Sequence, residues 1–434
     1  MKERFAKIDE TVYQRTAMAV LLCYMLSLPF TAFTKLFFNV HMLRELIGIL
    51  GLLAEAFIII YIGIHILCQK KMNFQVHIVD YLLLAMLVWS IPASLLAENR
   101  DKAIYGSLYM NDGLLTYFTY AAVYLCGKLI DDKQSKLKLV KVFAYSISAV
   151  CVLSVVQVIS KTSDIFGVFA ENVAGKCIYI SKYAGVYPNI NHFAYMLAMS
   201  VLALAGLAIY EENRWKKVVY WGLYGFNIWA LSVNNTVGSY LAVIIGLGFT
   251  TLLLFLRKEK KGKEIACMVA ILIIASAMGS VMTQNRLASS LGTTADDLVH
   301  LNKNEDAGSG RIKIWKQTIE YIVEKPVFGH GPENLGERYK NDGIFLVTRP
   351  HNEYLQHTVF LGIPASCMYL GALIKLLIEC LNKIKRVPPI VVILGGLVCA
   401  YCVSAFFGNT MYSTSVYFFM MLGMLSTYSK CIEE

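Results

Sequence analysis

Hydrophobic residues occur in this chain as long uninterrupted blocks separated by short polar segments. A helix rises 1.5 Å per residue, so a block of about 20 apolar residues can cross about 30 Å of hydrocarbon. Lipid offers no partners for backbone N–H and C=O groups, and such blocks must therefore be helical. The pattern predicts about twelve membrane-spanning helices, at roughly 16–38, 46–68, 78–97, 113–130, 139–160, 192–210, 217–233, 237–256, 264–282, 354–379, 388–407 and 412–429.

The polar segments between these blocks fall into two sets that differ in positive charge. If the N-terminus is cytoplasmic, the Lys- and Arg-rich segments all lie on one side: "QKK" at 69, "KLIDDKQSKLKLVK" at 128, "ENRWKK" at 212, "RKEKKGKE" at 257 and "NKIKR" at 382. The short loops on the other side carry few positive residues, as the positive-inside rule requires. An even number of spans then places both termini in the cytoplasm. The first block is expected to be a retained span, because no small-residue cleavage site follows it.

The composition fits this topology and narrows the class of protein. Of the 434 residues, 57% are hydrophobic and 16% are charged, which predicts an all-α polytopic membrane protein with one membrane domain over residues 1–434. The formal charge of +10 is explained by the positive loops, so nucleic-acid binding is not expected. The eleven cysteines indicate neither a disulfide framework nor a paired metal site.

One polar segment is far longer than the others, at residues 283–353 between the ninth and tenth predicted spans. A connection of this length is usually functional, and the topology places it on the outer face of the membrane. Within it, "SGRIKIWKQTIEYIVEKP" predicts an amphipathic helix that Ser309 caps and Pro326 ends, with Arg311 in its first turn. The segment is therefore expected to be partly ordered.

The residues best suited to chemistry follow this helix, in "RPHNEYLQH" from residue 349. Charged groups are unfavourable at the mouth of a membrane span, which indicates a function for them. Walker A, HExxH and G-x-S-x-G motifs are absent, and Asp296 and Asp297 lack the spacer expected of metal-dependent sugar-nucleotide sites. The histidines match no standard zinc spacing, so neither a metal nor another cofactor is predicted.

Two consecutive segments resemble a known family. The combination of "SGRIKIWKQTIEYIVEKPVFGHGPENL" and "RPHNEYLQHTVFLGIPASCMYLGAL" is similar to the signature region of the O-antigen ligase and O-antigen polymerase superfamily, in which a Gly-Arg segment with a following Trp precedes an outer His-Asn segment. "YPNINHFAYMLAMSVLALAG" from Tyr187 and "YGSLYMNDGLLTYFTY" from Tyr105 resemble two upstream family segments. The resemblance covers roughly residues 99–379, and 309–371 is its most specific part.

This resemblance implies both a reaction and two residue roles. Members transfer a glycan from a polyprenyl diphosphate carrier to an acceptor at the outer face, without a metal or a nucleotide sugar. Arg311 matches the arginine that contacts the diphosphate, and His351 matches the histidine that activates the acceptor. The chemistry of these side chains fits the two roles. A guanidinium group binds phosphate oxygens bidentately, and an imidazole can act as a general base for a hydroxyl group. Direct attack at the anomeric carbon would invert its configuration.

The chain departs from the family pattern at one position. Many members have Ser-Arg-Gly at the outer start of a central span, whereas "VNNTVGSYLA" places Val237 before Gly238 here. Three explanations remain open. Another cation supplies the charge, a pair of amides binds a differently placed head group, or the donor differs from that of the family. The candidate cations are Arg349, Arg338 and Lys316, and the amides are Asn234 and Asn235.

Asn352 is a further candidate for substrate binding; the alternative is that it only caps the following helix.

The sequence thus predicts a multi-pass glycosyltransferase of the cell membrane that polymerises or ligates lipid-linked surface polysaccharide at the extracytoplasmic face, with a polymerase preferred to a ligase. Its expected donor is a glycan on an undecaprenyl-diphosphate-type carrier, and its acceptor is a glycan or lipid-linked glycan. Membrane lipids surround the protein, and a chain-length regulator is a candidate partner.

Two other classes are compatible with a polytopic chain. A flippase or transporter of lipid-linked oligosaccharide would show related halves and cations along a central cavity, and the sequence has neither. The peptidoglycan glycosyltransferases of the shape-and-division family are also polytopic, but their motifs are not recognisable here.

Overall fold

The computed structural model describes residues 8–38, 40, 42–72, 75–107, 110–160, 170–173, 176–179, 183–299, 310–345 and 347–427. These residues form seventeen helices and one two-stranded hairpin, in which β1 (Ala170–Val173) pairs antiparallel with β2 (Lys176–Tyr179). The prediction of an all-α polytopic membrane protein is confirmed. The hairpin was not predicted.

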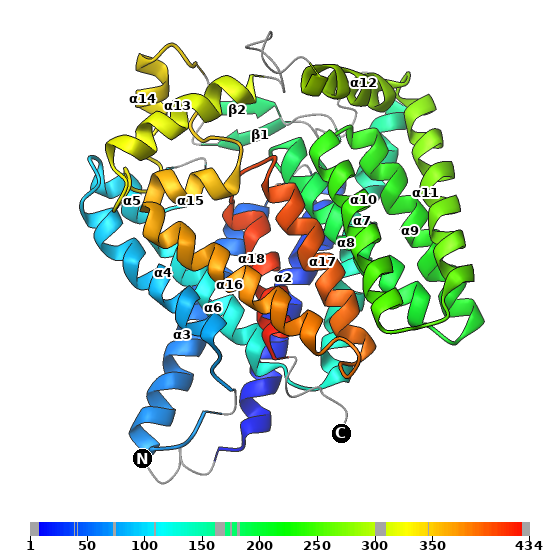
Figure 1. Cartoon of the computed structure of the whole chain (residues 1–434), viewed down its shortest axis with the longest axis horizontal. Coiled ribbons are helices and arrows are strands. Elements are labelled where there is room, and N and C mark those ends of the chain that lie inside the picture. The colour runs from blue at the N-terminus through cyan, green and yellow to red at the C-terminus, as the bar shows by residue number, and fades with distance from the viewer. Residues whose placement is uncertain are drawn as a thin grey trace.

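Most of the long helices form a bundle, in which consecutive members run in alternating directions (Figure 1). Eight described helices are long and apolar enough to cross a membrane. They are α2 (Glu10–Phe38), α3 (Leu43–Cys68), α4 (Ile78–Leu95), α7 (Lys133–Ser160), α8 (Ile190–Tyr210), α10 (Val237–Leu256), α11 (Gly262–Met282) and α16 (Ile363–Asn382). The other four predicted spans coincide with shorter or more polar helices, namely α6 (Leu114–Leu129), α9 (Arg214–Asn234), α17 (Pro389–Ala405) and α18 (Tyr412–Ser426).

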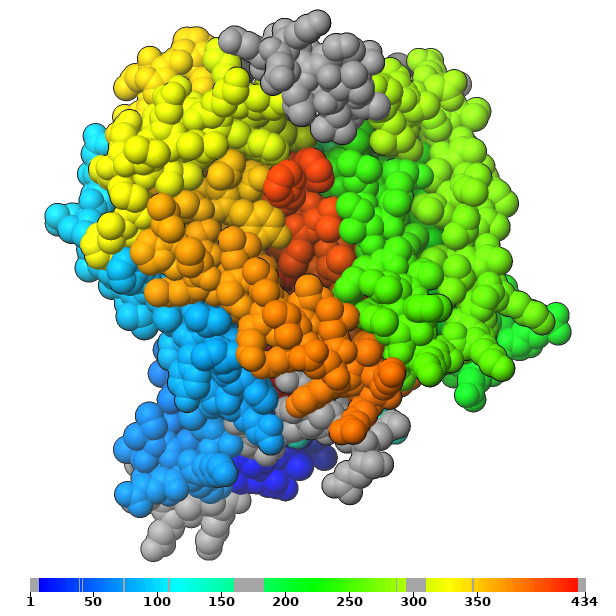
Figure 2. All heavy atoms as spheres, viewed as in Figure 1, coloured from blue at the N-terminus to red at the C-terminus, as the bar shows by residue number. Residues whose placement is uncertain are grey.

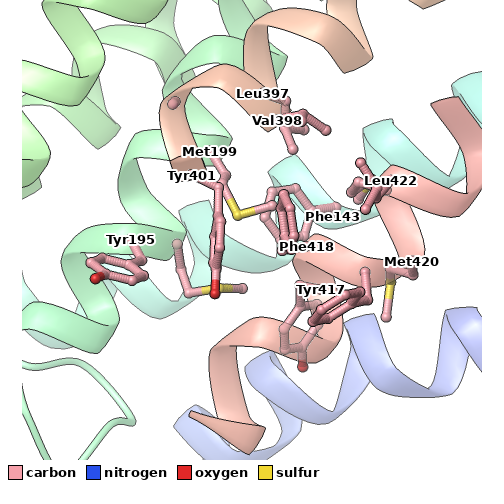
Figure 3. Close-up of a cluster of buried hydrophobic side chains, with 14 of the residues drawn as sticks. Phe143, Tyr195, Met199, Leu397, Val398, Tyr401, Tyr417, Phe418, Met420 and Leu422 are labelled. Carbon is pink, nitrogen blue, oxygen red and sulfur yellow. The ribbon is translucent and has the colours of Figure 1, made fainter. Parts of the chain in front are cut away.

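The centre of the bundle is built around α8 and α18, whose side chains are buried on nearly every face. Figure 3 shows side chains from α7, α8, α17 and α18 converging there. The rings of Tyr401 and Phe418 stack with centroids 4.1 Å apart. Helices α6 and α18 approach closely, because a Cβ at Gly127 would lie 2.3 Å from the carbonyl oxygen of Met420. Small residues allow such close helix contacts in membranes.

The bundle has one elaborate end, which we call the loop-bearing end. It carries α5 (Arg100–Tyr105), the β1–β2 hairpin, α12 (Arg286–Val299), α13 (Arg311–Glu324), α14 (Gly336–Asn341) and α15 (Glu353–Leu361) (Figure 1). The predicted amphipathic helix is α13, which ends before Pro326 as expected. Its predicted cap, Ser309, lies outside the described residues. The residue preceding the helix is Gly310, in the left-handed conformation.

The prediction of one continuous tenth span over 354–379 is wrong, because the chain bends sharply at Gly362. This glycine has φ of 89°, and a Cβ there would lie only 1.9 Å from the carbonyl oxygen of Val327. Glycine adopts such a conformation without the steric penalty of a side chain. The bend separates α15 from α16, and α15 lies across the loop-bearing end (Figure 1). The segment before α15 therefore turns in towards the bundle.

Candidate active site

The segment 349–352, which precedes α15, is joined to α13 by a tryptophan. Trp315 Nε1 donates a hydrogen bond to the carbonyl oxygen of Pro350 at 2.8 Å, and its ring packs edge-to-face on Phe406 with centroids 5.5 Å apart. Arg311 is four residues earlier on α13, so it shares a face of the helix with Trp315. Trp315 therefore holds α13 with Arg311 directed towards the 349–352 segment.

His351 is held in an uncommon backbone conformation by a residue from another loop. Its φ is +53°, a value that non-glycine residues adopt rarely and usually at functional positions. The backbone N–H of His351 donates to Asn409 Oδ1 at 2.8 Å. The same amide places its Nδ2 3.2 Å from His351 Nδ1. Asn409 thus fixes both the backbone and the ring, and the Nε2 side of the ring makes no described hydrogen bond.

Several buried polar atoms near this segment have no hydrogen-bond partner within the described part of the chain. They are His192 Nδ1 and Tyr195 Oη on α8, and Arg349 Nε, Thr410 Oγ1 and Ser413 Oγ. Figure 3 shows the Tyr195 hydroxyl directed away from the other labelled side chains. Buried polar groups are nearly always paired in proteins. These atoms are therefore candidates to bind a polar ligand.

A close approach of two chain segments shapes this site. A Cβ at Gly408 would lie 2.0 Å from the Tyr195 hydroxyl oxygen, so this loop packs closely against α8 and a side chain there would displace the Tyr195 ring. A Cβ at Gly238, at the start of α10, would similarly lie 2.5 Å from the side chain of Phe407. Position 237, where the family arginine is missing, is thus next to the loop that holds His351. In the space-filling view the surface is hollowed where red residues near the end of α17 lie between orange and green segments (Figure 2).

The electrostatic environment of His351 favours its neutral form. Burial, together with the positive charges of Arg311 and Arg349, lowers the pKa of His351 to about 4. Burial also lowers the pKa of Arg311, but an arginine remains charged at neutral pH. Among the described residues, Arg311 has no hydrogen-bond or ion-pair partner. Its guanidinium group is therefore available for an anion.

Arg349 differs, because its charge is already paired. It is 1% exposed and forms ion pairs with Asp112 at 3.1 Å and with Glu333. It also donates to the Thr410 carbonyl oxygen. Burial lowers the pKa of Arg349, but the two carboxylates outweigh this effect and raise it. Arg349 therefore ties together the segment before α6, the segment before α14 and the loop before α18.

Asp112 is surrounded by donors. It accepts hydrogen bonds from Tyr120 Oη at 2.9 Å and from Gln356 Nε2 at 3.1 Å, in addition to Arg349. Burial raises the pKa of Asp112 to about 6, although the charge of Arg349 opposes this shift. On α15, the Glu353 carboxylate accepts hydrogen bonds from the hydroxyl groups of Tyr369 at 2.7 Å and Tyr401 at 2.9 Å. The carboxylates of this region are thus engaged with donors other than His351.

The remaining predicted site residues have structural partners. Asn352 caps α15 by accepting from the Leu355 N–H at 3.0 Å. Arg338 forms an ion pair with Glu324, and its Cζ lies 4.9 Å from the centroid of the Tyr321 ring. No described interaction joins Arg338 to His351. Its role in substrate binding stays a prediction.

The two predicted amides lie where α9 meets α10. Asn234 donates to the carbonyl oxygens of Tyr183 at 2.9 Å and Ile190 at 3.1 Å. Asn235 ends α9 in the left-handed conformation and donates to Ser290 Oγ at 3.1 Å. No described interaction joins either amide to His351. Within the residues that the structure describes, no cluster of three or more His, Cys, Asp or Glu side chains could hold a metal ion.

The structure thus brings Arg311, Arg349, Asn352 and His351 together and adds three residues that sequence reasoning missed. His192 and Tyr195 lie in "YPNINHFAY", which carried part of the family resemblance, but only the position of α8 makes them candidates. Asn409 lies in "FFGNTMYS", where a Gly-Asn pair signals a turn and nothing more.

The comparison with known families concerns this same region. Residues 223–370 match the model of the O-antigen ligase family, and the matched segment contains Arg311, Arg349 and His351. No curated protein matches the chain. The match covers part of the residues that form the site on the loop-bearing end, and over residues 223–370 the chain is similar to the O-antigen ligase family.

Proposed function

We propose that this protein transfers a glycan from an undecaprenyl-diphosphate-type lipid carrier to the hydroxyl group of an acceptor sugar, and that it polymerises surface polysaccharide in the cell membrane. The observation that carries the proposal is the guanidinium of Arg311 beside neutral His351, amid buried polar atoms; neither that guanidinium nor those atoms have a partner among the residues that the structure describes. Arg311 would bind the diphosphate bidentately and offset its charge without a metal. Arg311 and His351 are therefore the proposed catalytic residues.

An apolar groove supports a lipid-linked donor. It has a volume of about 330 Å³ and is lined by residues of α10, α16, α17 and α18. Tyr354 is among the residues that line it, and it lies three positions after His351 in the chain. A polyprenyl chain in this groove would have its diphosphate next to the 349–352 segment. The carrier would then enter from the bilayer, while the acceptor glycan arrives from the aqueous side.

The reaction that fits this arrangement is a direct displacement. The acceptor oxygen bonds to the anomeric carbon as the bond from that carbon to the phosphate oxygen breaks, and the electron pair leaves with the diphosphate. Attack opposite the leaving group inverts the configuration. Asn352 and Arg349 would act by supporting the His351 segment. Asn234, Asn235 and Arg338 could contact only parts of the glycan away from the reacting bond.

An assay with purified components tests this function. The protein in lipid nanodiscs should convert a polyprenyl-diphosphate-linked oligosaccharide into longer lipid-linked products in the presence of a chelator, and release the polyprenyl diphosphate. A ladder of lengths supports a polymerase, whereas single transfer to a different acceptor supports a ligase. Movement of the donor between leaflets without any new glycosidic bond would instead identify a flippase. The same ladder, measured with and without a chain-length regulator, would show whether such a partner acts here.

We further propose that the loop-bearing end is extracytoplasmic, that both termini are cytoplasmic, and that 283–353 is one outer loop of a single membrane domain spanning 1–434. In a cysteine-free background, Glu337→Cys on α14 should react with an impermeant maleimide on intact cells. Lys260→Cys, in the positively charged turn between α10 and α11, is the matched control and should react only after permeabilisation. The reverse pattern would refute the orientation.

A further inference from the structure

The amide of Asn409 decides which nitrogen of His351 carries the proton. Asn409 Oδ1 accepts the backbone N–H of His351 at 2.8 Å. Because only the oxygen of an amide can accept, this contact establishes which end of the Asn409 side chain is which. The amide nitrogen then faces His351 Nδ1 at 3.2 Å. An amide NH2 group can only donate, so Nδ1 must be the acceptor, and a neutral ring carries its hydrogen on Nε2.

The groups around His351 do not favour a base. A histidine that accepts a proton at one nitrogen usually donates from the other to a carboxylate or carbonyl, which stabilises the imidazolium. In the described part of the chain no carboxylate hydrogen-bonds or pairs with His351. The charged and titratable groups that act on it come from α13 (Arg311) and from its own segment (Arg349), and His192 of α8 lies in the same cluster. Asp112 and Glu333 are both paired with Arg349.

The same neighbours suit an anion. Arg311 is cationic, the Tyr195 hydroxyl has no partner among the described residues, and His351 Nε2–H makes no described hydrogen bond. Neutral His351 is consistent with its pKa of about 4. We propose that Asn409 holds His351 as its Nε2–H tautomer, so that His351 serves as a neutral hydrogen-bond donor to the leaving diphosphate and not as the base for the acceptor. This inference rests on the proposed transfer reaction and assigns Asn409 as a positioning residue.

The step is balanced without proton transfer to His351. The bond between the anomeric carbon and the phosphate oxygen breaks, and its electron pair remains on that oxygen. His351 Nε2–H and Arg311 stabilise the negative charge that develops there. The acceptor hydroxyl proton passes to water at the aqueous face as the new glycosidic bond forms. A hydrogen bond that is stronger in the transition state than in the ground state raises kcat.

Asn409→Asp separates a donor from a base. An Asp carboxylate of the same shape can still accept a hydrogen bond from the His351 backbone N–H. It would also favour the ring tautomer that donates from Nδ1–H, which leaves a lone pair at Nε2. A donor role predicts a fall in kcat of about 10²-fold with a smaller change in KM. A base role predicts unchanged or increased kcat, since a carboxylate would strengthen the base. Asn213→Asp is the matched control, because Asn213 caps α9 at the opposite end of the bundle.

NMR spectroscopy tests the tautomer of His351 in the unaltered protein without measuring catalysis. The protein has eight histidines, and ¹⁵N-histidine NMR, with His351→Gln to identify the signal, reports the tautomer directly. We expect the proton on Nε2 in the unaltered protein. A proton on Nδ1 would overturn the proposal, and so would glycan transfer by Asn409→Asp at the rate of the unaltered protein. If the unaltered protein shows no transfer, the proposed function fails, while the NMR result still decides the tautomer.

Discussion

Arg311→Ala is expected to lower glycan transfer by about 10²–10³-fold, the usual effect of removing a charge-stabilising donor from a transition state. The reason is that Arg311 is partly buried beside His351, and no described residue pairs with its guanidinium group. The charge that develops on the leaving diphosphate would then lack its main cation. The measurement is kcat on purified lipid-linked donor.

Arg311→Lys refines this expectation. An ammonium group retains the charge but cannot reproduce the planar fork that binds two phosphate oxygens, so intermediate activity is expected. Lys340→Ala is the matched control, because Lys340 is an exposed cation on α14, also at the loop-bearing end. Equal losses in Lys340→Ala and Arg311→Ala would show that transfer depends on the overall positive charge of this end and not on Arg311 itself. Normal transfer by a stable Arg311→Ala variant would remove Arg311 from the mechanism.

Arg349→Ala is expected to reduce stability by about 3–5 kcal/mol, the typical result of removing one partner from a buried ion pair. Asp112 and Glu333 would both lose their cation in a buried environment. The segment that holds His351 would lose its connection to the Thr410 carbonyl oxygen. Transfer should fall together with the thermal unfolding temperature in detergent.

A double variant tests whether this effect comes from the paired charges. Arg349→Met combined with Glu333→Gln leaves Asp112 as the only carboxylate of the cluster and should be less destabilised than Arg349→Met alone. If Arg349 instead bound the donor directly, Arg349→Lys would raise the donor KM at unchanged stability. A melting temperature equal to that of the unaltered protein in Arg349→Ala would refute the structural role.

The long apolar blocks and the amphipathic character of α13 could be recognised in the sequence, and Arg311 and His351 could be selected there as candidates, because these inferences depend on local features. A block of apolar residues has only one way to cross lipid, and helical periodicity is a property of neighbouring residues. The motif that contains Arg311 and His351 lies within one stretch of chain, where the family resemblance was strongest. The bend at Gly362 escaped prediction, because it depends on a segment distant in the chain: Ile363 N–H donates to the Pro326 carbonyl oxygen at 2.8 Å, and a side chain at position 362 would clash with Val327.

The partners of these residues were decided only by the tertiary structure. Asn409 is 58 positions from His351, and Asp112 is 237 positions from Arg349. Whether a buried arginine binds substrate or neutralises carboxylates depends on which loops meet at the end of the bundle. Likewise, the protonated nitrogen of His351 depends on a single amide from another loop. Such interactions form when the helices pack, and neither periodicity nor composition records which distant polar groups will then share a buried space.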